Sequence, residues 1–95
     1  MRVVLSRRAN LDLLDQTEWL SQQSPAAARD VRARIEHAFR LLAQFPNSGI
    51  EVGEGEREWI IRIGRNGLLA VYRIEADRVI IGRLFHTSQD RTALR

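Results

Sequence analysis

Few side chains in this sequence could carry out acid-base or phosphate chemistry. Histidine titrates near neutral pH, so His86 could act as a general acid or base. The guanidinium groups of Arg62, Arg73 and Arg83 could hold phosphates or carboxylates. Metal-free cleavage of RNA needs such groups in one cluster, because a 2′-hydroxyl must be activated, charge on phosphorus stabilised and the leaving oxygen protonated. Chemistry of this kind therefore depends on whether the fold brings these four residues together.

The same residues also have structural interpretations. His86 would close a strand by a hydrogen bond to the following turn or to Asp90, four positions later. The arginines of a sheet could equally form a solvated edge that prevents aggregation. Aromatic residues at strand spacing are more often packing than catalytic groups, which favours a core position for Tyr72. Trp19 and Trp59 are expected to be core or edge anchors, although an exposed Trp19 would suit a partner.

Composition narrows the chemistry further. All 15 basic residues are arginine, and the net charge is +3. Arginine suits acidic partners, whether phosphates or an acidic peptide. Coding bias in a GC-rich genome, however, explains the missing lysines without any selection on function. There are 0 cysteines, which excludes disulfides, thiolate metal sites and cysteine nucleophiles. We expect no metal and no cofactor, and the modest charge with only 6% aromatic residues argues against a dedicated nucleic-acid binder.

The 95 residues are enough for one domain, residues 1–95. Hydrophobic residues at 44% and charged residues at 28% are typical of a folded soluble protein. No apolar run approaches the roughly 20 residues that cross a bilayer. The start, residues 1–6, is too short and too soon charged for a signal peptide, so we expect a cytoplasmic protein without a membrane partner.

The first half of the chain predicts one strand and two helices. Residues 2–6 are rich in β-branched side chains, and Ser6 is expected to cap a helix that ends near residue 22 or 23. Ser24 followed by Pro25 predicts the start of a second helix, antiparallel to the first. The first helix is expected to bury Ala9, Leu13, Thr17 and Leu20, with Leu14 and Trp19 beside them. The second is expected to bury Ala28, Val31, Ile35, Ala38 and Leu42, with Phe39, Leu41 and Phe45 beside them.

The second half predicts a loop and then three strands. Glycines and glutamates between residues 46 and 57 indicate a loop. Residues 58–64 and 68–74 are expected to pair across an Asn66-Gly67 turn. One face of this hairpin is then apolar, with Trp59 opposite Ile74, Ile61 opposite Tyr72 and Ile63 opposite Ala70. The other face would be a mixed surface without a second core, where a partner could bind; it would hold Ile60, Arg62, Leu69, Val71 and Arg73.

The last strand, residues 79–86, is apolar on both faces near its start, which favours a central place in the sheet. Arg83 and His86 differ in parity, so they should point to opposite faces. Residues 87–95 are expected to form one or two helical turns capped by Ser88. The order of elements predicts an α+β, two-layer domain, with a helical hairpin packed on a small twisted antiparallel sheet.

With these elements in place, the chain resembles the ParE/RelE superfamily of small bacterial toxins from type II toxin-antitoxin systems. The resemblance runs from residue 2 to about residue 91, and it depends on the order and spacing of short matches. These are Leu5-Ser6-Arg7-Arg8-Ala9, Asp12-Leu13, Leu41-Leu42, Pro46, Gly49, Arg57-Glu58, Val71-Tyr72-Arg73, Ile81, Arg83, Phe85-His86 and Asp90.

The resemblance implies a RelE/ParE-like fold and a partner. Such toxins are held inactive by a labile cognate antitoxin, often in a heterotetramer or a larger complex, and they inhibit growth and stabilise plasmids. Two branches differ in target. ParE-like members poison DNA gyrase and block replication without covalent chemistry of their own, whereas RelE-like members are endonucleases that cleave mRNA on the ribosome.

The residues favour the ParE-like branch. Without lysine, the lysine-dependent ribonuclease mechanism of some RelE-like members cannot operate, and another version uses an arginine three residues before the tyrosine, where this chain has Leu69. We therefore expect a gyrase inhibitor with no catalytic residue. If the chain is instead a metal-independent ribonuclease, its catalytic residues would be His86, Arg83, Arg62 and Arg73. Expected antitoxin contacts are Arg62, Arg65, Arg73, Arg83 and Trp19, and expected target contacts are Gln89, Asp90 and Arg91.

Overall fold

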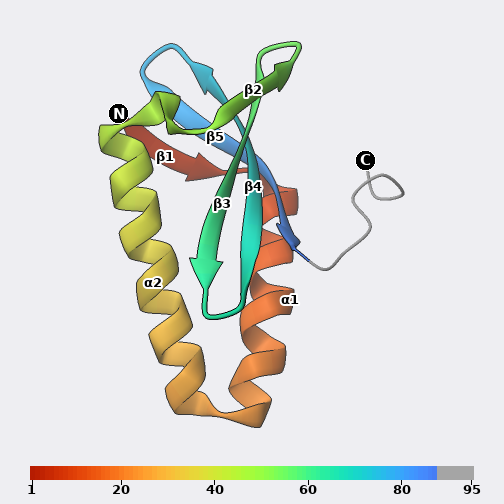
Figure 1. Ribbon diagram of the computed structural model, residues 1–95. Coiled ribbons are helices and arrows are strands. Elements are labelled where there is room, and N and C mark those ends of the chain that lie inside the picture. The colour runs from red at the N-terminus through yellow and green to blue at the C-terminus, as the bar shows by residue number, and fades with distance from the viewer. Residues whose placement is uncertain (88–95) are drawn as a thin grey trace.

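The computed structural model describes residues 1–87, which form two helices packed on one face of a five-stranded sheet (Figure 1). The fold is α+β, as predicted. In chain order the elements are β1 (Arg2–Leu5), α1 (Arg7–Gln23), α2 (Pro25–Gln44), the short 3₁₀ helix η1 (Pro46–Ser48), β2 (Ile50–Gly53), β3 (Glu56–Ile63), β4 (Asn66–Glu75) and β5 (Arg78–His86).

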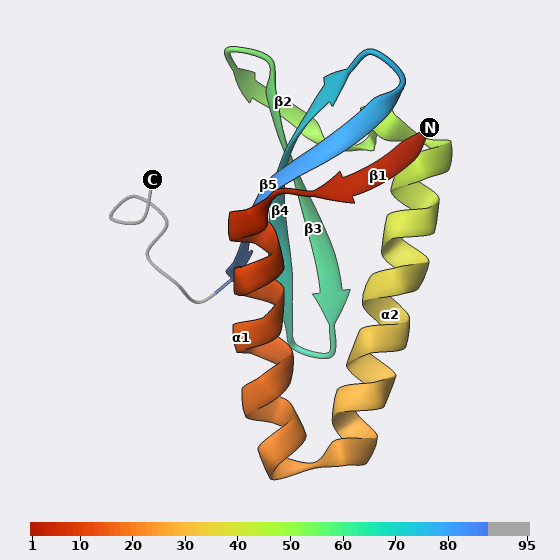
Figure 2. The same ribbon diagram turned by 180° about the vertical axis from the view of Figure 1, so that it is seen from behind.

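Serine caps begin both helices, as the sequence predicted. The Ser6 hydroxyl accepts a hydrogen bond from the Ala9 N–H at 3.0 Å, and the Ser24 hydroxyl accepts one from the Ala27 N–H at 3.2 Å. Pro25 occupies the first turn of α2, where no hydrogen bond from its nitrogen is needed. The two helices run antiparallel, and their connected ends extend beyond the β3–β4 turn (Figure 2).

The sheet differs from the predicted antiparallel one in two ways. Its order is β1-β5-β4-β3-β2, and β1 pairs parallel to β5, so the sheet is mixed. The chain returns to β1 only after the helical hairpin and three further strands, and this long connection allows parallel pairing. β2 lies within the stretch that was expected to be a loop. β5 is an inner strand, but β4 occupies the centre.

The predicted register of the β3–β4 hairpin is wrong by four residues. Trp59 pairs with Ala70 and Ile63 with Asn66, so the turn consists of Gly64 and Arg65. Gly64 supplies the positive φ, at 61°. Gly67 serves close packing instead, since a Cβ there would lie 2.6 Å from the carbonyl oxygen of Ile61. A shift by an even number keeps every side chain on its predicted face.

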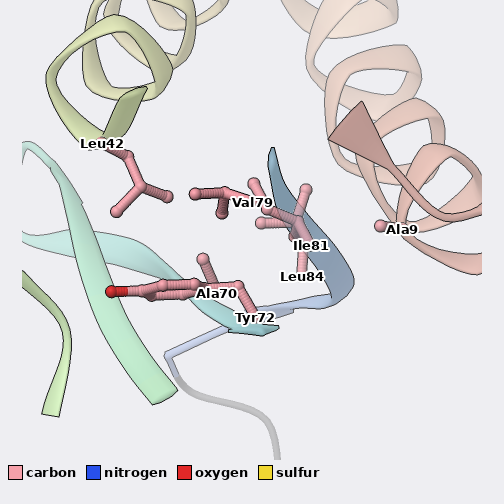
Figure 3. Packing of buried hydrophobic residues seen from close by; sticks show 7 residues of the cluster. All are labelled: Ala9, Leu42, Ala70, Tyr72, Val79, Ile81 and Leu84. Atoms are coloured by element: carbon pink, nitrogen blue, oxygen red, sulfur yellow. The ribbon is translucent and has the colours of Figure 1, made fainter. Parts of the chain in front are cut away.

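The core lies between the helices and the sheet. One cluster joins α1, α2, β4 and β5 (Figure 3): Ala9, Leu42, Ala70, Tyr72, Val79, Ile81 and Leu84. A second cluster joins α2 to the β3–β4 hairpin: Ile35, Ala38, Ile61 and Leu68.

Four side chains predicted beside the helix stripes are exposed instead. Leu14 and Trp19 on α1 are 58% and 64% exposed, and Leu41 and Phe45 at the end of α2 are also exposed. α1 buries Asp12 and Thr17 next to Ala9, so its inner face is rotated away from Leu14. Within residues 1–87, neither helix is long and apolar enough to cross a membrane.

Candidate functional site on the helix-free face of the sheet

The face of the sheet that the helices leave free carries most of the predicted site residues. Successive strand residues point to opposite faces, so Leu69 and Val71 point away from the helices, whereas Leu68 and Ala70 belong to the core. Phe85 pairs with Leu69, and these two residues with Val71 are almost fully buried. The prediction of a face without a second core is therefore wrong, because it has a small apolar centre.

Arg83 lies at this apolar centre and is tied to α1. Its guanidinium carbon is 4.4 Å from the centroid of the Phe85 ring. Its Nε and Nη2 atoms donate to the carboxylate of Asp12 at 2.9 and 3.3 Å, and the Leu84 N–H donates to the same carboxylate at 2.9 Å. The arginine therefore already has a bidentate anionic partner and an aromatic ring to stack on.

The other sheet arginines lie apart from Arg83. Arg62 is exposed on β3 opposite Gly67, and Arg65 is exposed in the β3–β4 turn. Arg73 is exposed near the β2–β3 turn, where it donates to the Glu54 carbonyl at 2.8 Å. The four arginines thus surround the free face and do not converge on a common point.

His86 lies on the other side of the sheet from Arg83. It pairs with Leu68, whose side chain belongs to the core on the helix side, whereas Arg83 pairs with Val71. His86 lines a groove of about 560 Å³ between the helical hairpin and the β3–β4 turn. Trp19 lines the same groove from α1, and Gln16 and Asn66 add side-chain amides to it. The two residues that a ribonuclease mechanism would combine are therefore separated.

Tyr72 holds the connection between α2 and β2. Its hydroxyl donates to the Pro46 carbonyl at 2.7 Å and accepts from the Gly49 N–H at 2.8 Å. The side chain is 1% exposed, which agrees with its predicted core position, although its strand partner is Arg57 and not Ile61. Arg57 adds a bond of 2.8 Å to the Gly49 carbonyl.

Three of the predicted contacts, Gln89, Asp90 and Arg91, lie outside the described residues, as does the predicted turn capped by Ser88. His37 is exposed and lines a second groove between α2 and β3. Among residues 1–87, no cluster of His, Asp and Glu has the arrangement of a metal site.

The chain matches the family described as "ParE toxin of type II toxin-antitoxin system, parDE" over residues 3–91. It belongs to the ParE toxin family. Membership in this family makes it the toxin component of a type II toxin-antitoxin system and implies an antitoxin partner.

Two known proteins resemble this ParE-family toxin over nearly its whole length. Toxin RelE3 of Caulobacter vibrioides is 32% identical over 89 residues, covering 94% of this chain and 97% of the relative. A solved structure titled "Chromosomal ParDE TA system from P. aeruginosa" has a chain that superposes with a TM-score of 0.72 at 21% identity, covering 93% of this chain and 97% of the other. At that identity the structural match supports the fold alone.

Sequence reasoning missed two features of this ParE-family toxin. The bond between Asp12 and Arg83 joins residues 71 positions apart, and no local pattern marks such a pair. A signal for it did exist, since an aspartate at a position of α1 that faces the core needs a cationic or N–H partner. The unusual role of Gly49, which leaves room for the Tyr72 hydroxyl, had no signal beyond the glycine itself.

Proposed function

We propose that this ParE-family toxin stops growth by binding DNA gyrase and blocking replication, and that it has no ribonuclease activity. The separation of Arg83 from His86 carries the proposal. Acid-base cleavage of RNA needs a proton-transfer group and a charge-stabilising group at one phosphate, the roles expected of His86 and Arg83. His86 faces the helix-side groove, while Arg83 stacks on Phe85 at the free face.

The hydrogen bonds that Arg83 makes with Asp12 also support this proposal. A phosphate at the free face would compete with the Asp12 carboxylate, which already accepts two hydrogen bonds from the guanidinium. At the centre of that face, Leu69 is 3% exposed and offers no donor or charge. A toxin that works by binding another protein needs neither a free phosphate site nor a general acid.

For the target contact we propose two surfaces. One is the tail with Gln89, Asp90 and Arg91, and the other is the outer surface of the helical hairpin. On α1 the hairpin exposes Leu11 and Leu14 at 46% and 58%. Exposed large apolar side chains on one helix are typical of protein-binding surfaces.

For the antitoxin we propose contacts with the exposed arginines Arg62, Arg65 and Arg73 and with Trp19. Arg83 would contribute through its Nη groups at the edge of the apolar centre, since its side chain is 24% exposed. Binding to gyrase requires a cytoplasmic toxin. We also propose that loss of the antitoxin releases the toxin and so stabilises a plasmid that carries both genes.

The deciding experiment is pulse labelling of DNA and protein synthesis during the first minutes after the chain is induced without antitoxin. The gyrase proposal expects DNA synthesis to fall first and purified gyrase to yield DNA breaks when the toxin is added. If protein synthesis falls first and mRNA is cut within codons, the proposal is wrong.

A RelE-like, ribosome-dependent mRNA endonuclease is the second candidate. Two observations favour it: the relative at 32% identity is named RelE3, and Arg62, Arg73 and Arg83 share the free face of the sheet. Purified ribosomes with a defined mRNA test it directly. Cleavage that disappears in Arg73→Ala, a variant of an exposed side chain that leaves the core intact, would establish this candidate.

A further inference from the structure

The outward side of α1 carries a narrow stripe of exposed side chains, the α1 stripe. It consists of Arg7, Leu11, Leu14 and Glu18. These residues follow one another at steps of four, three and four positions, which keeps them within about 60° of the helix circumference. All four are exposed, and the residues that α1 buries lie on other sides of the helix. The stripe therefore faces solvent and has no partner within residues 1–87.

The α1 stripe is complementary to a reversed copy of itself. Its two leucines lie in the middle, with a cation at one end and an anion at the other. When two copies of α1 lie antiparallel about a two-fold axis level with the midpoint, Arg7 of each copy lies opposite Glu18 of the other. Leu11 then lies opposite Leu14. Each facing pair occurs twice, as an isologous contact requires, and the apolar centre has an ion pair at each end.

Charge selects this antiparallel direction. In a parallel arrangement Arg7 would face Arg7 of the other copy, and Glu18 would face Glu18, so like charges would oppose association. No ion pair within residues 1–87 uses Arg7 or Glu18, so both charges are available to a partner.

The matching stripe on α2 lacks this property. It has the same spacing and is also exposed: Arg29, Ala33, Glu36 and Arg40. A reversed copy would place Arg29 opposite Arg40 at both ends, and its centre holds one small apolar side chain and one charge. Self-complementarity therefore distinguishes the outward side of α1 from that of α2 and does not follow from helix spacing alone.

We propose that the toxin associates with a second copy of itself through α1, with the two helices antiparallel and Leu11 of each copy packed on Leu14 of the other. Each copy contributes one helix, so the interface is small and the dimer is weak and reversible. The proposal goes beyond the gyrase target and does not depend on it. The two leucines also belong to the hairpin surface proposed for the target, so a dimer would cover part of that surface.

Sedimentation equilibrium of the purified full chain, from micromolar to millimolar concentration, measures the association. Arg7→Glu should weaken it at least about fivefold, because like charges then face each other at both ends, and Glu18→Arg should do the same. Both changes together should restore it to within about twofold of the parent chain. Each change favours the helix dipole, so unfolding would not explain a loss. A parent chain that stays monomeric, or a double variant that is not restored, overturns the proposal.

Matched variants separate this contact from non-specific association. Arg29→Glu changes the net charge as Arg7→Glu does, but on α2, and should leave the association unchanged. Leu14→Ala should weaken association at least about fivefold. Trp19→Ala removes a side chain of similar exposure, 64% against 58%, that lies about 110° around α1 from the stripe, and it should have no effect. Equal effects within either pair would contradict the proposal.

Cross-linking tests the direction of the helices. The chain has 0 cysteines, so introduced thiols are unique. A short thiol-reactive cross-linker should join an equimolar mixture of Arg7→Cys and Glu18→Cys. It should not join Arg7→Cys to itself, because the two copies of that position lie about 16 Å apart along antiparallel helices. Equal cross-linking of Arg7→Cys alone would mean parallel helices and overturn the proposal. These measurements contain no gyrase, so their outcome and that of DNA labelling are independent.

Discussion

Arg83 on β5 donates through Nε and Nη2 to the carboxylate of Asp12 on α1, at 2.9 and 3.3 Å. β1 stops pairing with β5 at Ile81, so the edge of β5 beyond that residue has no neighbouring strand among the described residues. The Asp12 carboxylate takes the place of that strand by accepting the Leu84 N–H. The Asp12 side chain therefore pairs one backbone N–H of β5 and at the same time ties α1 to the sheet through Arg83.

Asp12→Ala should lower the free energy of unfolding by about 3 kcal/mol, because it leaves a buried N–H and a partly buried guanidinium without their acceptor. Urea denaturation measures this. Arg8→Ala is the control, since Arg8 is 3.7 Å from the same carboxylate but its side chain is 63% exposed. The control should change stability by about 0.5 kcal/mol or less. If both variants lost the same free energy of unfolding, the hydrogen bonds of the Asp12 carboxylate to β5 would not be important for stability.

Gly49→Ala should be far more destabilising than Gly82→Ala. A Cβ at Gly49 would lie 2.6 Å from the Tyr72 hydroxyl and 2.9 Å from the Glu58 carbonyl, whereas at Gly82 the nearest atom is 3.8 Å away. Overpacking and a broken hydrogen bond together should cost about 3 kcal/mol at Gly49. Gly82→Ala should be neutral within about 1 kcal/mol. Thermal and urea unfolding measure the stability of both variants. Equal stability losses would mean that the space around Tyr72 is not as tight as the structure indicates.

The two tryptophans should differ in their contribution to stability. Trp59 packs against both core clusters, so Trp59→Ala should cost about 3 kcal/mol. Trp19 is 64% exposed, and Trp19→Ala should cost about 0.5 kcal/mol or less. Each single-tryptophan variant can be followed by fluorescence during urea unfolding. A large loss for Trp19→Ala would place that side chain in the core.

His86→Ala should still block DNA synthesis when induced without antitoxin, because a gyrase-binding toxin needs no general acid. The rate of DNA labelling, corrected for the amount of folded protein, should stay within about twofold of the parent chain. Truncation after Asp90 is the contrasting variant, and it should weaken inhibition if the tail contacts gyrase. Loss of toxicity in a fully folded His86→Ala variant would favour the ribonuclease candidate instead.

The sequence predicted the elements whose signals are local. The caps at Ser6 and Ser24 fixed the starts of both helices, and hydrophobic alternation placed Trp59, Ile61 and Tyr72 on one face. The prediction of the hairpin turn was wrong because two glycines, Gly64 and Gly67, lie within four residues and either could have formed the turn. Gly64 has the positive φ that a turn needs, while Gly67 is required by the close approach of β3, which only the folded sheet reveals.

The features that the sequence did not predict depend on contacts between residues far apart in the chain. β2 is exposed at all four positions, so burial left no alternating pattern in its sequence. The parallel pairing of β1 with β5 joins residues that are 76 positions apart, as Arg2 and Arg78 are. Among the candidate site residues, the parity of Arg83 and His86 was enough to predict that they diverge, but the Asp12 partner of Arg83 could not be read from spacing.

The hydroxyl of Tyr72 couples two properties of the fold. It stabilises the connection from α2 to β2, and by the same two bonds it keeps residues 46–49 away from β3. A substitution that removed the hydroxyl would loosen the connection and at the same time free these residues to pair with β3 beside Ile60, where the outer edge of β3 has no neighbouring strand among residues 1–87. Loss of this hydroxyl would therefore alter the α2–β2 connection and the uncovered part of the β3 edge together.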